Sequence, residues 1–380
     1  MKEQTNVYFP NLDGLRFFAF LLVFVNHTVI CLGFTYPNSH YIFIRENFLK
    51  NGDMGVSFFF VLSGFLITYL LLKEKEENNR ISIKNFYARR VLRIFPLYYL
   101  VVIITLFIIP IVKNHVPMNF PMNISTSTLS PWYYFTFTGN FDFMKNGISN
   151  VILSVLWSVS VEEQFYLFWP LIVAFIPKKY LIHSFALVII ASIGFRYFYT
   201  DGRGMLLKFH SLSCMTYLAM GAIMAYLATS EKVVSLIKRI PRWMIVLVYV
   251  VGISCIPLRL YIWKFGAHYV LVASFVPVVL ALFFSFIIME QCFSEKSFYK
   301  MSRLTFISSM GKYTYGMYCY HMIVFFALLF GLHLTGVELS QLNKSAFVAM
   351  VITAFAGTCF VSVVSYHYFE MLFLKLKKRF

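Results

Sequence analysis

The sequence predicts an all-α membrane protein, a polytopic bundle of about ten transmembrane helices with both termini in the cytoplasm. Three observations support this prediction. First, 59% of the 380 residues are hydrophobic, 13% are charged and the mean hydropathy is +0.72, which is far too apolar for a soluble domain of this size. Second, the apolar residues occur in long runs. Third, the Lys and Arg residues gather at alternate ends of these runs.

Each of the ten predicted helices is an apolar run long enough to cross about 30 Å of hydrocarbon. Polar stretches of loop length separate the runs, and a further apolar run at 132–139 is too short to span. No polar stretch is long enough for a soluble domain, so we expect one membrane domain over residues 1–380 with no appended soluble domain. The ten runs are 15–34, 54–72, 91–112, 155–176, 180–199, 211–229, 242–262, 268–290, 314–335 and 346–370.

The net charge of +17 is distributed in a way that indicates orientation. When the N-terminus is assigned to the cytoplasm and the helix ends alternate, 23 of the 33 Lys and Arg residues fall on the inner side. This is the positive-inside bias of bilayer proteins. We therefore attribute the basic excess to topology and to contact with anionic lipid, and we do not expect nucleic acid as a partner.

The first run carries Arg16 and, eleven residues later, His27. Eleven steps of ~100° bring both side chains to one helix face, ~16 Å apart along the axis. If Arg16 marks a membrane surface, His27 lies near mid-bilayer, where ionisable groups are usually functional. Asp13 is expected as the N-cap. His27 could deprotonate a hydroxyl or carry an acyl group. Alternatively, Arg16 snorkels to the helix end and His27 bonds a neighbouring helix.

A cluster of arginines precedes the third run. Arg90 and Arg93 are three residues apart, so they project from one helix face, and Arg89 is adjacent. Two guanidinium groups there could grip the phosphate oxygens of a cofactor that arrives from the cytoplasm. Ordinary positive-inside flanking is the alternative.

Two adjacent carboxylates, Glu162 and Glu163, lead into the fourth run. Ser160 and Glu163 have the spacing of a capping box, which would make Glu163 structural. Glu162 has no such role. A carboxylate beside an imidazole would orient the ring and stabilise its cation, so either glutamate is a candidate to support His27.

The ninth run contains a cluster of tyrosines and a histidine, Tyr315, Tyr318, Tyr320 and His321. This cluster could line a polar substrate tunnel or form a hydrogen-bonded group between helices. In the second run, small residues from Gly55 to Gly64 favour close helix packing. The six cysteines are scattered without metal-ligand spacing, so no metal is predicted.

Taken together, these segments resemble the acyltransferase-3 family of integral membrane acyltransferases. The resemblance runs from Asn11 to about Phe373, in the family's order. Arg16 and His27 match the Arg and His of the family's first span, and Arg90 and Arg93 match its two-arginine motif. The other matching segments are Phe58–Ile67, Trp157–Tyr166, Tyr315–His321 and Phe369–Glu370.

The resemblance implies transfer of an acetyl group from acetyl-CoA to a hydroxyl of an exported carbohydrate or cell-envelope glycan, in a bacterial cytoplasmic membrane. We expect Arg89, Arg90 and Arg93 to hold the phosphates of acetyl-CoA, and Arg16 to flank the path to His27. A transporter of a glycan or lipid intermediate is the competing class, since buried Arg, His and Glu residues also line transport pathways. The acceptor and the choice of acetyl over succinyl stay open.

Overall fold

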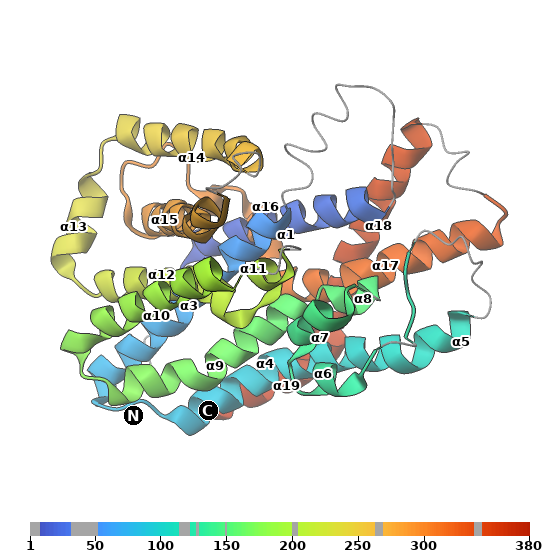
Figure 1. Ribbon diagram of the computed structural model, residues 1–380, viewed down its shortest axis with the longest axis horizontal. Coiled ribbons are helices and arrows are strands. Elements are labelled where there is room, and N and C mark those ends of the chain that lie inside the picture. Colours follow the sequence, from blue (N-terminus) through green and yellow to red (C-terminus); the bar gives the residue numbers. More distant parts are fainter. Residues whose placement is uncertain are drawn as a thin grey trace.

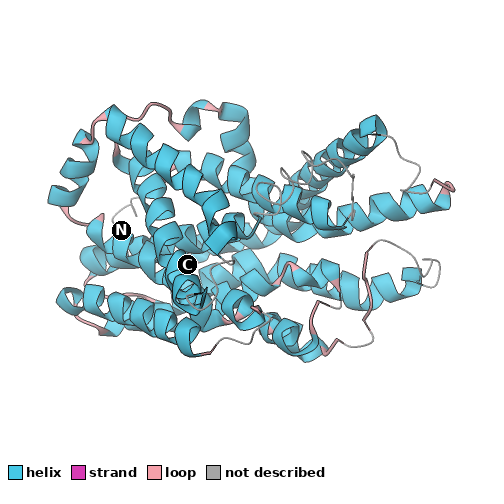
Figure 2. Ribbon diagram, turned by 45° about the horizontal axis from the view of Figure 1, so that its top comes forward, coloured by secondary structure: helices cyan, strands magenta, loops and turns pink. Residues whose placement is uncertain are grey.

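The computed structural model describes residues 8–31, 52–113, 122–126, 129–148, 150–199, 204–262, 269–337 and 344–380. Within these ranges the regular structure is helical, and the β-pairing is limited to an isolated bridge between Ile124 and Asn150 (Figure 2). The predicted all-α class is confirmed.

The first group of helices precedes Trp157. They are α1 (Pro10–Cys31), α3 (Gly52–Asn78), α4 (Ile83–Ile103), η2 (Ile104–Ile108), α5 (Ile109–Lys113), α6 (Pro131–Phe135), α7 (Gly139–Asn146) and α8 (Val151–Ser154). The next group comprises α9 (Trp157–Phe175), α10 (Lys178–Phe198), α11 (Met205–Phe209), α12 (Ser211–Leu227), α13 (Glu231–Arg239), α14 (Arg242–Ile262) and α15 (Tyr269–Phe293).

The C-terminal part contains two long helices joined to short ones. These elements are η4 (Met301–Arg303), α16 (Thr305–Met310), η5 (Gly311–Tyr313), α17 (Thr314–Leu334), α18 (Lys344–Ser365), η7 (Tyr366–Glu370), α19 (Met371–Leu376) and η8 (Lys377–Arg379). In Figure 1, most of the long helices run roughly along the longest axis of the molecule.

Seven helices in the described ranges are long and apolar enough to cross a membrane, which makes the chain a multi-pass membrane protein. They match seven of the ten predicted runs. The segment Met205–Leu227 (α11 and α12) together with Glu231–Arg239 (α13) would add an eighth span, although the two parts are bent by 98°. The runs at 15–34, 211–229 and 242–262 form α1, α12 and α14, but the first extends beyond the described residues and carries charges. Ten spans and cytoplasmic termini therefore stay predictions. The seven are Gly52–Asn78, Ile83–Val112, Val151–Phe175, Lys178–Phe198, Tyr269–Phe293, Thr305–Leu334 and Ser345–Leu376.

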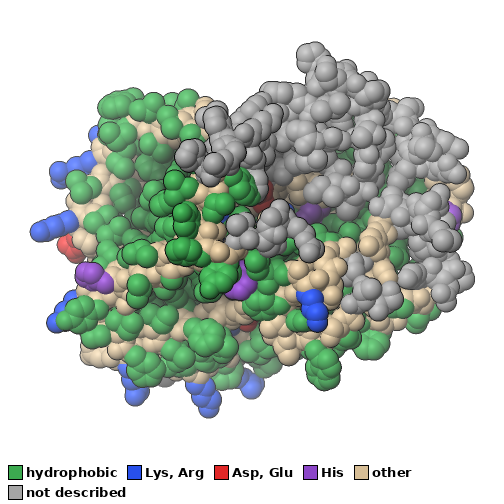
Figure 3. All heavy atoms as spheres, viewed as in Figure 1, with side chains coloured by type: hydrophobic (Ala, Val, Ile, Leu, Met, Phe, Trp, Pro, Cys, Tyr) green, Lys and Arg blue, Asp and Glu red, His purple; other side chains and the backbone are tan. Residues whose placement is uncertain are grey.

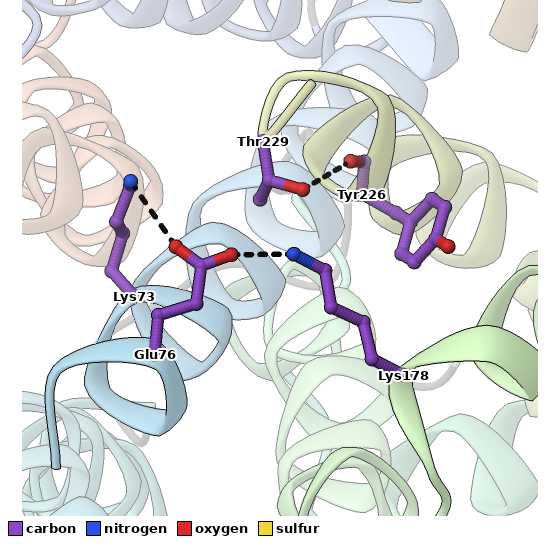
Figure 4. Close-up of polar contacts among 5 residues, drawn as sticks. All are labelled: Lys73, Glu76, Lys178, Tyr226 and Thr229. Carbon is purple, nitrogen blue, oxygen red and sulfur yellow. Dashed lines mark hydrogen bonds and ion pairs between the residues drawn. The ribbon is translucent and has the colours of Figure 1, made fainter. Parts of the chain in front are cut away.

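One end of the bundle, which we call the basic end, joins the end of α3, the start of α10 and the C-terminus. Glu76 on α3 accepts hydrogen bonds from Lys73 at 3.3 Å and from Lys178 on α10 at 2.6 Å (Figure 4). Arg89 near the start of α4 donates to the carbonyl oxygen of Phe380 at 2.8 Å. In Figure 3, most of the visible Lys and Arg side chains lie along the left and lower edges of the molecule.

Glycines let the central helices α3 and α12 approach each other closely. A Cβ atom added to Gly64 would lie 1.9 Å from the carbonyl oxygen of Leu218, and one added to Gly221 would lie 2.0 Å from that of Val61. Backbone atoms cannot be displaced as easily as a flexible side chain. The prediction that small residues of the second run serve close packing is therefore confirmed.

We expect Gly64→Ala and Gly221→Ala each to destabilise the protein by about 1–3 kcal/mol, because the added methyl group overpacks the contact. Gly194→Ala on α10 is the matched control, since its Cβ would meet no heavy atom within 4 Å, and alanine should stabilise that helix by up to about 1 kcal/mol. Thermal denaturation of the purified variants in detergent checks this. Equal melting temperatures for Gly64→Ala and Gly194→Ala would contradict the packing assignment.

Candidate functional site

Six of the predicted site residues line one cavity of about 190 Å³ between α1, α3, α4, α9 and α17. We call it the arginine cavity, because three guanidinium groups meet one carboxylate in its wall. The apolar part of the wall comes mainly from phenylalanine and aliphatic side chains of α3. The polar or charged lining residues are Arg16, Ser63, Arg90, Arg93, Ser158, Glu162, Tyr166, Thr314, Tyr315 and Tyr318.

Arg16 reaches this cavity from the first turns of α1. The helix begins at Pro10, and proline suits the first turn of a helix. The prediction that Asp13 is the N-cap is therefore wrong, because Asp13 lies inside the first turn. Its carboxylate instead forms an ion pair with Arg16 and accepts a hydrogen bond from Tyr8 at 2.7 Å. This pairing fixes the Arg16 guanidinium at the cavity wall.

On α4, Arg90 and Arg93 face the cavity, as their spacing predicts. The Arg90 guanidinium carbon lies 5.5 Å from the ring centroid of Phe86 and 5.7 Å from that of Tyr166. Its Nε is buried and has no hydrogen-bond partner among the described residues. A buried donor without a partner is costly, so this N–H is available to an anionic ligand.

Arg89 lies apart from the cavity. Its guanidinium donates to Glu74 at 3.1 Å and to the Phe380 carbonyl oxygen at 2.8 Å. These bonds engage both terminal nitrogens, so the structure gives Arg89 a role in joining the start of α4 to the C-terminus. Arg89 is not among the lining residues of the arginine cavity, so the structure does not support its predicted contact with phosphate.

Lys377, at the C-terminal end, joins the arginine cluster in the structure. Burial, together with the nearby positive charges of Arg90, Arg93 and Arg89, lowers the pKa of Lys377 to about 8. In the sequence, Lys377 is one of the 23 basic residues on the predicted inner side. No local motif marks it, because its proximity to α4 depends on how α19 and η8 pack.

The two glutamates occupy different surroundings. Glu162 lines the cavity and accepts a hydrogen bond from Tyr166 at 3.1 Å, and Tyr166 also pairs with Ser63. Glu163 is not among the lining residues, and its Oε1 is buried without a hydrogen-bond partner in the described part of the chain. In the described ranges His27 has no hydrogen bond to either carboxylate.

The predicted capping box of Ser160 and Glu163 does not form. The helix α9 already begins at Trp157, and the Ser160 hydroxyl donates to the Leu156 carbonyl oxygen at 3.2 Å. Asn150 instead caps the short preceding helix α8, since its side chain accepts from the backbone N–H groups of Ile152 and Leu153 at 3.0 Å. Glu163 is therefore free of the structural role that the spacing indicated.

His27 lies against a second histidine. Its Nδ1 is 2.8 Å from Nε2 of His321 on α17, and Nδ1 of His321 is 2.7 Å from the carbonyl oxygen of Tyr318. Neither histidine is among the residues that line the arginine cavity. Tyr318 is, and it connects the two parts of the site. Its hydroxyl bonds to Ser158 at 2.7 Å and to the Val155 carbonyl oxygen at 2.8 Å.

The structure thus brings most of the predicted residues together in two adjoining groups. Arg16, Arg90, Arg93, Glu162, Tyr315 and Tyr318 line the cavity, whereas His27 and His321 form a pair behind Tyr318. Tyr315 donates to the Ile94 carbonyl oxygen at 2.9 Å. Sequence reasoning missed Ser63 and Tyr166 as cavity residues. Both lie in segments that carry the family resemblance, but Ser63 was interpreted as a packing residue.

Comparison with known proteins indicates the family of the chain. The family model described as "Acyltransferase domain" (Acyl_transf_3) matches residues 9–367. The chain is 28% identical over 255 residues to O-acetyltransferase OatA of Staphylococcus aureus strain NCTC 8325, a match that covers 65% of this chain and 39% of the relative. It is 31% identical over 229 residues to the protein named "Putative O-acetyltransferase SACOL0978" of Staphylococcus aureus strain COL, over 58% of this chain and 35% of that relative.

The chain therefore spans well under half the length of the curated relatives it matches. No solved structure is significantly similar to it. The family match covers nearly the whole chain. On this evidence the chain belongs to the acyltransferase-3 family.

Proposed function

We propose that the protein is a membrane O-acetyltransferase, which moves an acetyl group from cytoplasmic acetyl-CoA to a hydroxyl of an exported carbohydrate or cell-envelope glycan. The observation that supports this most is the arginine cavity. Arg16, Arg90 and Arg93 share its wall with one carboxylate, Glu162, and the buried Arg90 Nε has no partner among the described residues. Such an excess of cationic donors suits the phosphates of a nucleotide-bearing donor.

The donor would approach from the basic end, which we infer to be cytoplasmic. In this proposal Arg90, Arg93 and Lys377 hold the phosphates, and the thioester arm enters the cavity past Arg16. Tyr315 and Tyr318 are also among the lining residues. The arm would reach His27 beyond Tyr318, whose backbone carbonyl already bonds the His27–His321 pair.

The chemical step would be proton transfer to His27. As the acceptor hydroxyl oxygen attacks the thioester carbonyl carbon, the imidazole takes the hydroxyl proton. The carbon–sulfur bond then breaks, and the departing thiolate takes the proton from the imidazolium, which yields the ester and free CoA. In the alternative route, His27 attacks the thioester first and carries the acetyl group to the hydroxyl. Either role is one that a positioned imidazole can perform.

The acceptor would approach from the opposite end of the bundle, so that transfer delivers the acetyl group across the membrane. The relatives named as O-acetyltransferases support an oxygen acceptor, and their bacterial source supports a location in a bacterial cytoplasmic membrane. Exported polysaccharide, peptidoglycan, lipooligosaccharide and small secreted metabolites are the candidate acceptors. Succinyl-CoA is the candidate alternative donor.

The experiment that tests this function offers labelled acetyl-CoA to the purified protein in liposomes, with and without an envelope glycan fraction. An acetyltransferase releases free CoA when the acceptor is present and transfers the label to the glycan. A transporter of a glycan or lipid intermediate would do neither. Heat-inactivated protein serves as the control. If the active protein releases equal amounts of CoA with and without the glycan fraction, the proposal is refuted.

Lys377 makes the proposed donor site sensitive to pH. Burial and the neighbouring arginines lower the pKa of Lys377 to about 8, so its positive charge is present below pH 8 and is lost as the pH rises through that value. We expect the KM for acetyl-CoA to rise by up to about fivefold between pH 7 and 9. In Lys377→Arg the rise should be smaller, because a guanidinium stays protonated. Initial-rate measurements on both proteins check this, and identical pH dependences would contradict it.

A further inference from the structure

We propose that His321 is a positioning residue, which fixes the tautomer of His27 and thereby makes Nε2 of His27 the reacting nitrogen. This inference rests on the proposed function, since it assigns the atom through which His27 acts. Of the two alternatives that the sequence leaves open for His321, it follows the hydrogen-bonded group between helices and not the lining of a substrate tunnel. The inference is drawn from the hydrogen bonds that connect Tyr318, His321 and His27.

The direction of each hydrogen bond follows from the chemistry of its two atoms. The carbonyl oxygen of Tyr318 can only accept, so the contact of 2.7 Å requires a hydrogen on Nδ1 of His321. In a neutral imidazole the other nitrogen then has a lone pair, so Nε2 of His321 accepts. The contact of 2.8 Å therefore requires a hydrogen on Nδ1 of His27. Neutral His27 is left with its lone pair on Nε2.

The surroundings hold both rings in this arrangement. The imidazole planes of His27 and His321 are nearly parallel, with an interplanar angle of 8° and a centroid distance of 5.1 Å, so the rings meet edge to edge, as an N–H···N hydrogen bond in the ring plane requires. His321 is 1% exposed, and the ring of Phe20 packs edge-on against it at 5.9 Å. Because water has little access to His321, it cannot readily replace the hydrogen bonds that set the tautomer.

Tyr318 anchors the chain of hydrogen bonds at its other end. Its hydroxyl is bonded to Ser158 and to the Val155 carbonyl oxygen, so the start of α9 holds the turn of α17 that carries His321. The same tyrosine lines the arginine cavity. The reacting imidazole is therefore oriented by the helices that form the proposed donor site.

This geometry gives His321 the function that a carboxylate has in many hydrolase triads. When Nε2 of His27 takes the hydroxyl proton, the ring becomes a cation, and its Nδ1–H donates more strongly to Nε2 of His321. When the thiolate recovers the proton, the neutral tautomer returns. The carrier route uses the same atom, since Nδ1 is occupied and only Nε2 has a lone pair to attack the thioester carbon. His321 contacts no reacting atom in either route.

Three variants of the full-length protein test the assignment by kinetics. His321→Leu removes the acceptor at similar size, and we expect kcat to fall by at least about tenfold and up to about 10⁴-fold, with the KM for acetyl-CoA unchanged. His321→Gln can accept from the Nδ1–H of His27 through its amide oxygen, so it should recover most of the lost kcat. If His321 had only a structural role, the kcat values of His321→Leu and His321→Gln would not differ in this way. His27→Ala provides the reference for complete loss.

Nitrogen NMR of the isotope-labelled wild-type protein gives a second readout that needs neither activity nor a variant of His321. Protonated and unprotonated ring nitrogens have well-separated chemical shifts, and His27→Ala identifies the His27 signals. We expect a protonated Nδ1 and an unprotonated Nε2. A hydrogen on Nε2 of His27 would overturn the inference. So would a wild-type kcat in His321→Leu when His27→Ala is inactive.

Failure of the proposed function would give a different result from failure of the tautomer assignment. If His27→Ala retains wild-type activity, His27 is not the base or the carrier, whatever tautomer it has. If His321→Leu does not fold, the NMR measurement on the wild-type protein decides the matter alone.

Discussion

Replacing His27 with alanine is expected to abolish acetyl transfer, with a fall in kcat of at least about 10²–10⁴-fold. The imidazole is the group that accepts the hydroxyl proton or carries the acetyl group in the proposed step, and no other histidine in the described ranges is bonded to His321. The yield of membrane-inserted protein should be unchanged. Acetyl transfer from labelled acetyl-CoA, measured alongside the melting temperature, checks both expectations.

His183→Ala is the matched control for this substitution, because His183 is an exposed residue of α10 and lines no described part of the site. It should keep wild-type kcat and KM. Wild-type-like transfer by His27→Ala would refute the role of His27, and equal losses in both variants would indicate that the assay reports folding.

The double replacement of Arg90 and Arg93 by alanine is expected to raise the KM for acetyl-CoA by about 10²-fold, with a smaller effect on kcat. Hydrogen bonds to charged groups contribute about 1.5–3 kcal/mol each, and both guanidinium groups face the cavity. Initial rates at varied acetyl-CoA concentration measure the change.

Arg89→Ala separates phosphate binding from a general loss of positive charge. Arg89 is adjacent in sequence, but Glu74 and the Phe380 carbonyl oxygen already occupy its terminal nitrogens. We expect its effect on donor KM to be much smaller than that of the double variant. An unchanged KM in the double variant would indicate that Arg90 and Arg93 serve membrane topology and do not bind the donor.

The helical part of the fold could be predicted because it depends on local sequence. Each apolar run is long enough to be a helix in a bilayer. The run 54–72 lies within α3, and residues 269–290 of the run 268–290 lie within α15. Helix ends were predicted less well, since they depend on which residues cap them. Asp13 is a residue type that favours the N-cap, yet α1 starts at Pro10. Asn150 caps α8, and α9 begins at Trp157, before Ser160.

The features of the site also separate into those that the local sequence could predict and those that it could not. The common face of Arg90 and Arg93 follows from their spacing on one helix, so it could be predicted. The contact between His27 and His321 joins residues 294 positions apart, and no periodicity within one helix contains that information. The same reason explains why a carboxylate was expected beside His27. Glu162 has suitable chemistry, but the packing of α17 brings His321 to the imidazole, and Glu162 bonds Tyr166 instead.

The central claim is that a donor bound at the basic end acetylates a hydroxyl on the other side of the membrane through His27. Membrane vesicles of opposite orientation, prepared from cells that express the protein, test it most directly when labelled acetyl-CoA is added outside. Inside-out vesicles should incorporate label into envelope glycan, whereas right-side-out vesicles and inside-out vesicles with His27→Ala should not. Equal labelling of both orientations, or labelling that survives His27→Ala, would contradict the account.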